Sequence, residues 1–156
     1  SVIGTKKSLW FQSVFNLFFN YSGNQIIIDI NQTKYNLSTP GERFNSAFSF
    51  VRYLQKVHKP EEFMDIVLNI GGELCLPTRE NQHLSWNELE ILDKEPLITI
   101  GAHTDQHFPL NLCNYELSKT EIIDSKIKLE IESKDVIKLS ISVVIFLISS
   151  AVFVLK

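Results

Sequence analysis

The sequence has few cysteines and no dense group of basic residues. Cys75 and Cys113 are the only two cysteines in 156 residues, and they do not form a C-x-x-C pair. This spacing fits neither a disulfide framework nor a zinc ribbon, so we expect both to be reduced thiols used in packing. The chain has 15 Lys+Arg against 18 Asp+Glu and a net charge of -3. Because phosphate binding requires clustered Lys and Arg, we expect no nucleic-acid partner.

The first residues also lack a secretion signal. They contain no initiator methionine and no apolar stretch ahead of a small-residue cleavage site. The start therefore favours no compartment, and the localisation stays unknown. We expect the chain to begin inside a domain.

Apolar residues make up 44% of the chain but are unevenly distributed. Residues 139–155 form a run of 17 with 13 apolar side chains, four Ser and no charge. As a helix this run would be about 25 Å long, the lower edge of what spans a hydrocarbon core of ~30 Å. Lys138 and Lys156 flank it as membrane anchors would. Three interpretations remain open: a transmembrane helix that associates the chain with a membrane, a buried strand, or a frame-shifted end.

The first half of the chain predicts helices around one hairpin. Apolar residues recur at helical spacing, and β-branched runs are separated by turn residues. The expected elements are a helix over 8–19, a hairpin of strands 25–30 and 33–37, a helix from Thr39-Pro40 to a break at Lys59-Pro60, and a helix that ends at Gly71-Gly72.

The second half predicts a helix, a strand, a loop and a helix. Ser85 and Glu88 form a capping box before a helix of about two turns. Residues 97–100 form a compact strand that stops at Gly101, and a second capping box, Ser118 to Glu121, opens a helix through Leu129. This order predicts an α/β unit, in which ligands usually gather at the carboxyl ends of strands.

Two histidines lie directly after the predicted strand. His103 and His107 could reach one metal ion if the backbone between them makes a helical turn, because side chains four residues apart share a face. Thr104 could hydrogen-bond backbone groups and hold the loop, whereas Asp105 is expected to point off the shared face. Two ligands do not complete a site, since catalytic zinc normally takes three protein ligands and one water.

The same segment resembles a known family. The matching residues are WNEL at 86–89, EPLITIGAHTDQHFPL at 95–110 and EIIDSK at 121–126. They resemble the middle of the polysaccharide deacetylases with NodB homology, carbohydrate esterase family 4, which have a W-x-E-L helix, a strand ending in I-G-[SA]-H-[ST]-x-x-H-P-x-L, and a helix with E-I-x-x-S-K. The agreement is densest over 85–130. The helices of the first half resemble an insertion found in one branch of the family.

The resemblance implies a fold, a ligand and a reaction. The expected fold class is α/β: a partial distorted (β/α) barrel over 1–138, with a helical insertion in its first half and an apolar C-terminal segment over 139–155. His103 and His107 would bind a divalent metal, most often zinc, and Thr104 would brace the loop. The family chemistry is metal-dependent hydrolysis of N-acetyl or O-acetyl groups on carbohydrates, so the expected partner is an N-acetylated carbohydrate or cell-envelope polysaccharide.

Several family features are missing from this chain. The family's Asp-Asp motif supplies the general base and the third metal ligand, and no Asp-Asp pair occurs here. The Arg segment, with its aromatic-Pro pair, and the late Leu-x-His segment are also absent, and Phe108 is inserted after the second histidine. We therefore expect a family domain that is incomplete at both ends, has no catalytic residues and is inactive alone. The alternative is a non-catalytic, membrane-anchored remnant that binds glycan or protein.

The remaining histidines and both tryptophans are assigned structural roles. His58 and His83 lack the setting of the loop histidines and are interpreted as solvated loop or helix-end residues. Trp10 and Trp86 are interpreted as packing aromatics rather than as sugar-stacking platforms.

Overall fold

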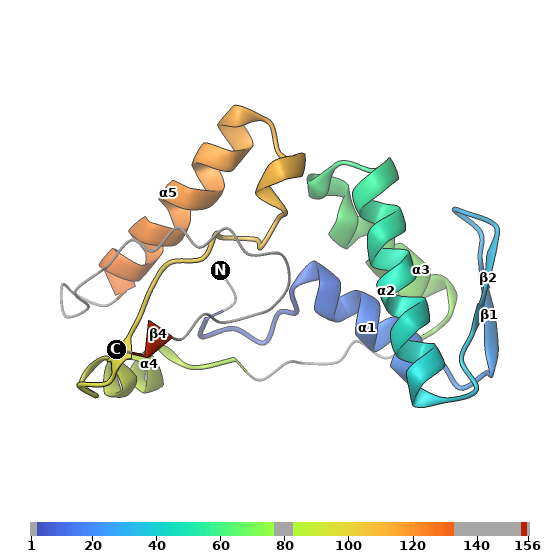
Figure 1. Ribbon diagram of the computed structural model, residues 1–156, viewed down its shortest axis with the longest axis horizontal. Helices are drawn as coiled ribbons and strands as arrows, with labels where there is room; N and C mark the ends of the chain where they lie inside the picture. The colour runs from blue at the N-terminus through green and yellow to red at the C-terminus, as the bar shows by residue number, and fades with distance from the viewer. Residues whose placement is uncertain (1–2, 77–82, 133–153, 156) are drawn as a thin grey trace. The chain divides into compact units, whose positions relative to one another are not determined.

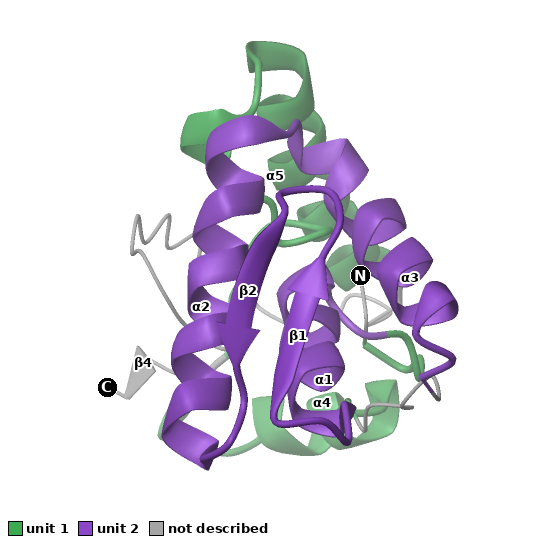
Figure 2. Cartoon of the chain, turned by 90° about the vertical axis from the view of Figure 1, so that its right-hand side faces the viewer, with its two compact units in different colours: residues 1–7, 82–156 green, residues 8–81 purple. Residues whose placement is uncertain are grey.

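The computed structural model describes residues 3–76, 83–132 and 154–155. The chain divides into two compact units. Unit 1 comprises Ser1–Lys7 and Gln82–Lys156, and unit 2 comprises Ser8–Asn81 (Figure 2). The described residues are mixed α/β and mostly helical, which confirms the coarse fold class.

The described residues of unit 2 contain three α-helices. They are α1 (Trp10–Asn20), α2 (Pro40–Val57) and α3 (Phe63–Glu73), with a 3-10 turn at Pro60–Glu62 before α3. Thr39 caps α2, because its side chain accepts a hydrogen bond from the amide of Glu42 while the Glu42 carboxylate accepts one from the amide of Thr39. The predicted helix start at Thr39-Pro40 is therefore confirmed.

The predicted hairpin is also confirmed. β1 (Gln25–Ile28) pairs antiparallel with β2 (Thr33–Asn36), with Ile26 opposite Tyr35. Ile26, Ile28 and Tyr35 are buried, and the Tyr35 ring lies edge-on to Phe18 of α1 and Phe50 of α2. One face of the hairpin thus completes the apolar core of unit 2.

Unit 1 carries the segment with the loop histidines. Its elements are α4 (Trp86–Asp93), β3 (Ile98–Thr99), a 3-10 turn at Leu110–Leu112, α5 (Tyr115–Glu132) and β4 (Val154–Leu155). The Ser85 capping box is formed as predicted. Leu89, Ile100 and Leu129 are the buried apolar cluster, with Trp86 packed against it. In Figure 1 the yellow chain that follows α4 leads through the 3-10 turn to α5.

Two predicted helix ends were wrong. The helix expected to stop at Gly71-Gly72 continues to Glu73, and the left-handed residue after it is Cys75, with a φ of 51°. The second capping box does not cap, because α5 begins four residues earlier, where the amide of Leu117 donates to the Asn114 side chain. Glu121 is consequently inside α5 rather than in its first turn.

The strands form no barrel within the described residues. They make two separate two-stranded antiparallel sheets, β1–β2 and β3–β4. Among those residues, no helix combines the length and apolar character needed to cross a membrane. The predicted transmembrane helix over 139–155 lies outside the described residues except at its end. There, Val154–Leu155 form a strand, so the prediction of a helix through Leu155 was wrong.

Candidate functional site

The loop after β3 brings the two predicted histidines together. The ring centroids of His103 and His107 lie 5.0 Å apart, with an angle of 67° between the ring planes. The intervening backbone is not the helical turn that their spacing suggested, because Thr104 and His107 are left-handed, with φ of 63° and 60°. The loop conformation, and not a shared helix face, places the imidazoles side by side.

Glu121 of α5 holds this loop. Its carboxylate accepts hydrogen bonds from the Asp105 amide at 3.1 Å and from the Gln106 amide at 2.9 and 3.2 Å. Glu121 is only 2% exposed. Burial raises the pKa of Glu121 above its ordinary value, although the backbone amides that bond its carboxylate act in the opposite direction. The backbone of the loop therefore provides the main polar contacts of a buried carboxyl group.

A second contact joins the loop to α5. The Lys128 ammonium lies 2.7 Å from each carboxylate oxygen of Asp105, and the Gln106 side chain also donates to that carboxylate. Burial favours the neutral form of Asp105, but the Lys128 hydrogen bond helps to hold its pKa below the ordinary value. Asp105 is therefore an ionised group turned toward α5, in line with the prediction that it would not share the histidine face.

The environment of His107 disfavours its protonated form. Burial lowers the pKa of His107 below its ordinary value, and the nearby charge of His103 lowers it further. Thr104 is half-buried beside it, and no hydrogen bond of the Thr104 hydroxyl is found in the part of the chain that the structure describes. The bracing role assigned to Thr104 stays a prediction, because the bonds that hold the loop come from Glu121 and Lys128.

The expectation of a metal-binding protein was wrong for the described residues. Within 3–76, 83–132 and 154–155, no group of three or more His, Cys, Asp and Glu side chains could hold a metal ion. His103 and His107 are adjacent, but the carboxylate between them in sequence is bound by an ammonium. These residues alone do not provide the three protein ligands of a catalytic zinc site.

Sequence reasoning missed Glu121 and Lys128. Glu121 was assigned to a helix cap and Lys128 to no role. One signal could have found them: Glu121, Ser125 and Lys128 recur at helical spacing on the face that also carries Leu129. Glu121 and Ser125 are 2% and 7% exposed, whereas Ile122 and Ile123 on the same helix are each 41% exposed. The polar stripe, not the isoleucines, faces the interior of unit 1.

The other candidate residues lie apart from this loop. His83 is bonded to the Lys7 carbonyl at 2.9 Å, Trp10 is 3% exposed in the core of unit 2, and Trp86 packs in unit 1. Both tryptophans therefore serve in packing, as predicted. Cys75 is exposed rather than packed, and Cys113 is half-buried.

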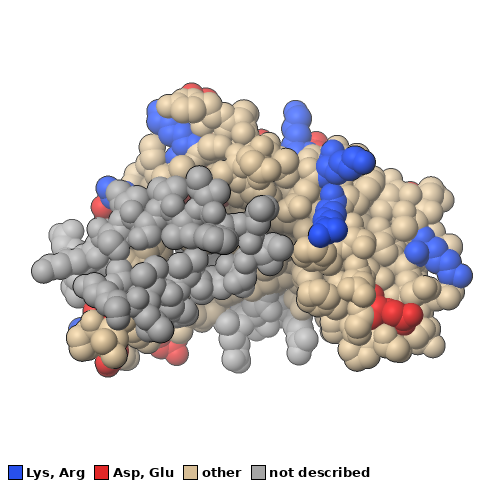
Figure 3. All heavy atoms as spheres, viewed as in Figure 1, with Lys and Arg blue, Asp and Glu red and all other residues tan. Residues whose placement is uncertain are grey.

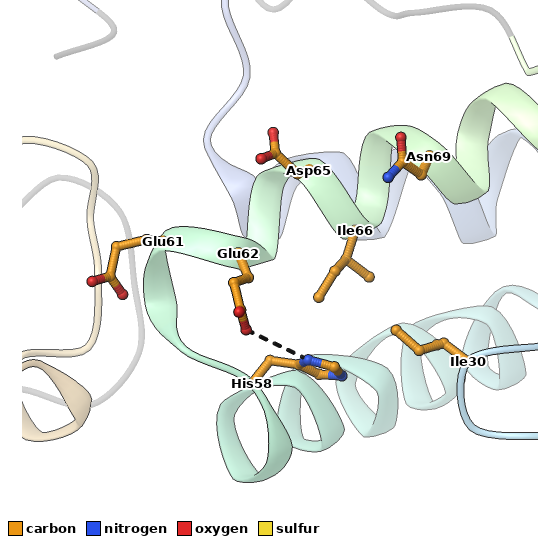
Figure 4. A pocket seen from close by; sticks show the side chains of 7 residues that line it. All are labelled: Ile30, His58, Glu61, Glu62, Asp65, Ile66 and Asn69. Atoms are coloured by element: carbon orange, nitrogen blue, oxygen red, sulfur yellow. Dashed lines mark ion pairs between the residues drawn. The ribbon is translucent and has the colours of Figure 1, made fainter.

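His58 borders a shallow acidic hollow in unit 2. It ends α2, as expected for a helix-end histidine, and its Nδ1 lies 3.7 Å from Glu62. The hollow measures about 350 Å³. Figure 4 shows the lining side chains, which are Ile30, His58, Glu61, Glu62, Asp65, Ile66 and Asn69. The carboxylates belong to exposed helix surface, and the hollow offers no second feature that identifies a ligand.

Charged side chains are dispersed over the visible surface. On the face drawn in Figure 3, Lys and Arg stand in small groups among uncharged residues.

No family model matches the chain, and neither curated proteins nor solved structures include a match to it. The assignment to the deacetylases therefore rests on the motif residues alone.

Proposed function

We propose that unit 1 is a segment of a polysaccharide deacetylase of the NodB-homology type, part of a distorted (β/α) barrel that acts on N-acetylated carbohydrate. The observation that supports this most is the pairing of His103 and His107, at 5.0 Å, directly after β3. The motif predicts two imidazoles that work together at that place, and the order α4, β3, loop and α5 follows the family's order.

The described residues can perform only part of such a reaction. Hydrolysis of an acetamide requires an activated water, a base that takes its proton and an acid that protonates the leaving amine. His103 and His107 can donate or accept hydrogen bonds at the acetyl group, and neutral His107 can accept a proton. The family's metal would polarise the carbonyl, but the described ligands do not fit it, so no step here depends on it.

A second candidate is a non-catalytic glycan-binding module. The ion pair between Asp105 and Lys128 favours this alternative, because both oxygens of the carboxylate nearest the histidines are already bound. A loop built in this way can recognise a sugar amide through its imidazoles without hydrolysing it. The two candidates share the ligand and differ in turnover.

Binding and turnover of a chitin oligosaccharide separate these functions. We expect the sugar to shift the amide resonances of residues 103–107 in the purified full chain, and to lose that effect when His103 and His107 are both changed to Ala. His83→Ala, in the same unit but bonded to Lys7, is the matched control.

Acetate release distinguishes the candidates once binding is seen. Release that requires the histidine pair supports the deacetylase, and binding without release supports the binding module. If the oligosaccharide shifts no loop resonance and no acetate appears, with or without added zinc, both functions are wrong.

A further inference from the structure

The histidine loop adopts a conformation that its own residues do not favour. Thr104 and His107 both have positive φ. This region is uncommon for residues other than glycine and is especially unfavourable for a β-branched side chain such as Thr. Such backbone persists only where surrounding contacts enforce it. The contacts that enforce the loop must act between these two residues.

Glu121 makes those contacts. The two amides that lie between the left-handed residues, those of Asp105 and Gln106, both donate to its carboxylate. A carboxylate that accepts two amides fixes the orientation of both peptide planes. Because Glu121 lies in the middle of an 18-residue helix, its position is set by α5 and not by the loop.

Lys128 adds a second fixed point on the same helix. It lies seven residues after Glu121, which is about two helical turns, so both side chains leave the same face of α5. Lys128 holds the side chain of Asp105, and Glu121 holds the backbone amide of the same residue. The loop is thus held at its backbone and at one side chain.

We infer that Glu121 is the positioning residue of the histidine pair. By accepting the two amides it imposes the positive φ of Thr104 and His107 and so sets the separation of the imidazoles. The inference rests on the proposed function only in taking that pair as the working part of the loop. The carboxylate acts through the backbone amides that it bonds.

Two substitutions distinguish positioning from simple packing. Glu121→Leu removes both acceptor oxygens but is apolar and favourable in a buried helix position. Glu121→Gln retains one oxygen, and in this structure a single oxygen, Oε2, already accepts both amides. Positioning predicts that Gln preserves the loop better than Leu, whereas packing predicts the reverse. Glu130→Leu, at an exposed position of the same helix, is the control.

The readouts are amide hydrogen exchange and the imidazole ring NMR shifts at fixed pH in the full chain. In Glu121→Leu we expect exchange at Asp105 and Gln106 to accelerate at least about tenfold, as loss of a charge-assisted hydrogen bond implies. The ring resonances of His103 and His107 should shift as the loop rearranges. Glu121→Gln should lie between Leu and the unsubstituted chain, and Glu130→Leu should change neither readout.

Each outcome decides the inference. Unchanged amide exchange in Glu121→Leu, unmoved imidazole resonances, or a Leu variant that preserves the loop better than Gln would overturn it. If Glu121→Leu fails to fold, Gln alone decides: faster exchange confined to Asp105 and Gln106 supports positioning, and unchanged exchange contradicts it. Failure of oligosaccharide binding with these results intact would remove the proposed function and leave the positioning role.

Discussion

Unit 2 and unit 1 are each stabilised internally by a different kind of interaction. The largest fully buried side chains of the described residues all belong to unit 2, among them Phe18, Phe50 and Phe63 at 0% exposure. Unit 1 has a described apolar cluster of only three buried residues, and beside it Asp105, Glu121 and Ser125 are buried polar groups. Apolar packing is non-directional, whereas hydrogen bonds to buried charges depend on distance and angle. The candidate site lies in the unit whose geometry depends on directional bonds.

The difference between the units follows from the residues that each of them buries. Packing tolerates small displacements, so the apolar core of unit 2 favours stability more than a fixed geometry. A pair of imidazoles needs a defined separation, and buried hydrogen bonds define it better because an unmet bond is costly. Unit 1 therefore combines a small apolar cluster with a rigidly held loop.

The largest expected effect is the loss of an aromatic ring from the core of unit 2. Phe50→Ala should lower the stability of unit 2 by about 3–5 kcal/mol, because it leaves a cavity among fully buried side chains. Phe44→Ala, on the same helix but 52% exposed, is the control and should cost far less. Labelling with 5-fluorotryptophan gives one ¹⁹F signal in each unit, at Trp10 and at Trp86, during urea unfolding. If Phe50→Ala moves the Trp86 transition as much as the Trp10 transition, the loss is not confined to unit 2 and the units do not differ as described.

The next effect concerns the ion pair in unit 1. Lys128→Met should lower the stability of unit 1 by about 1–2 kcal/mol, because it removes the ammonium bonded to a buried carboxylate, while the 44% exposure of Lys128 reduces the loss. Lys126→Met is the matched control, because Lys126 is about as exposed as Lys128 but its partner Glu130, 3.5 Å away, is 46% exposed rather than buried. That control should change stability by less than about 0.5 kcal/mol. If both substitutions move the unfolding transition of the Trp86 signal equally, the two ion pairs do not differ as described.

The helix caps test both units with the same chemistry. Thr39→Ala in unit 2 and Ser85→Ala in unit 1 each remove a side-chain oxygen that accepts an amide of the first helical turn. Each should cost about 1 kcal/mol. The first should move the transition of the Trp10 signal and the second that of Trp86. Equal shifts of both signals by either substitution would mean that the two units unfold as one.

The smallest expected effect is the pH dependence contributed by His107. Its pKa in the folded chain is lower than the ordinary 6.5, so the folded state binds the proton less tightly than the unfolded state. This stability contribution is present above pH 6.5 and is lost as the pH falls from 6.5 toward the folded pKa. His107→Gln should flatten this part of the pH profile of unit 1. An unchanged slope in that window would show that His107 titrates alike in both states.

Much of the fold could be predicted from local patterns. The start of α2 at Thr39-Pro40, the hairpin and the capping box of α4 depend on residues within a few positions of one another, and all three are formed. The wrong start predicted for α5 has an identifiable cause. At α5 two cap signals competed, and the start was decided by Asn114, whose side chain accepts the Leu117 amide. Local chemistry permits either start, and the surrounding contacts select one.

The sequence by itself determined which residues form helices and strands, and it predicted that His103 and His107 belong to one loop after a strand. Only the tertiary structure decided how that loop is folded. Its left-handed residues are enforced by Glu121, sixteen positions after Asp105, and by Lys128, twenty-three positions after it. These bonds depend on which face of α5 turns toward the loop. Burial of the whole helix sets that rotation, and no short segment of sequence encodes it.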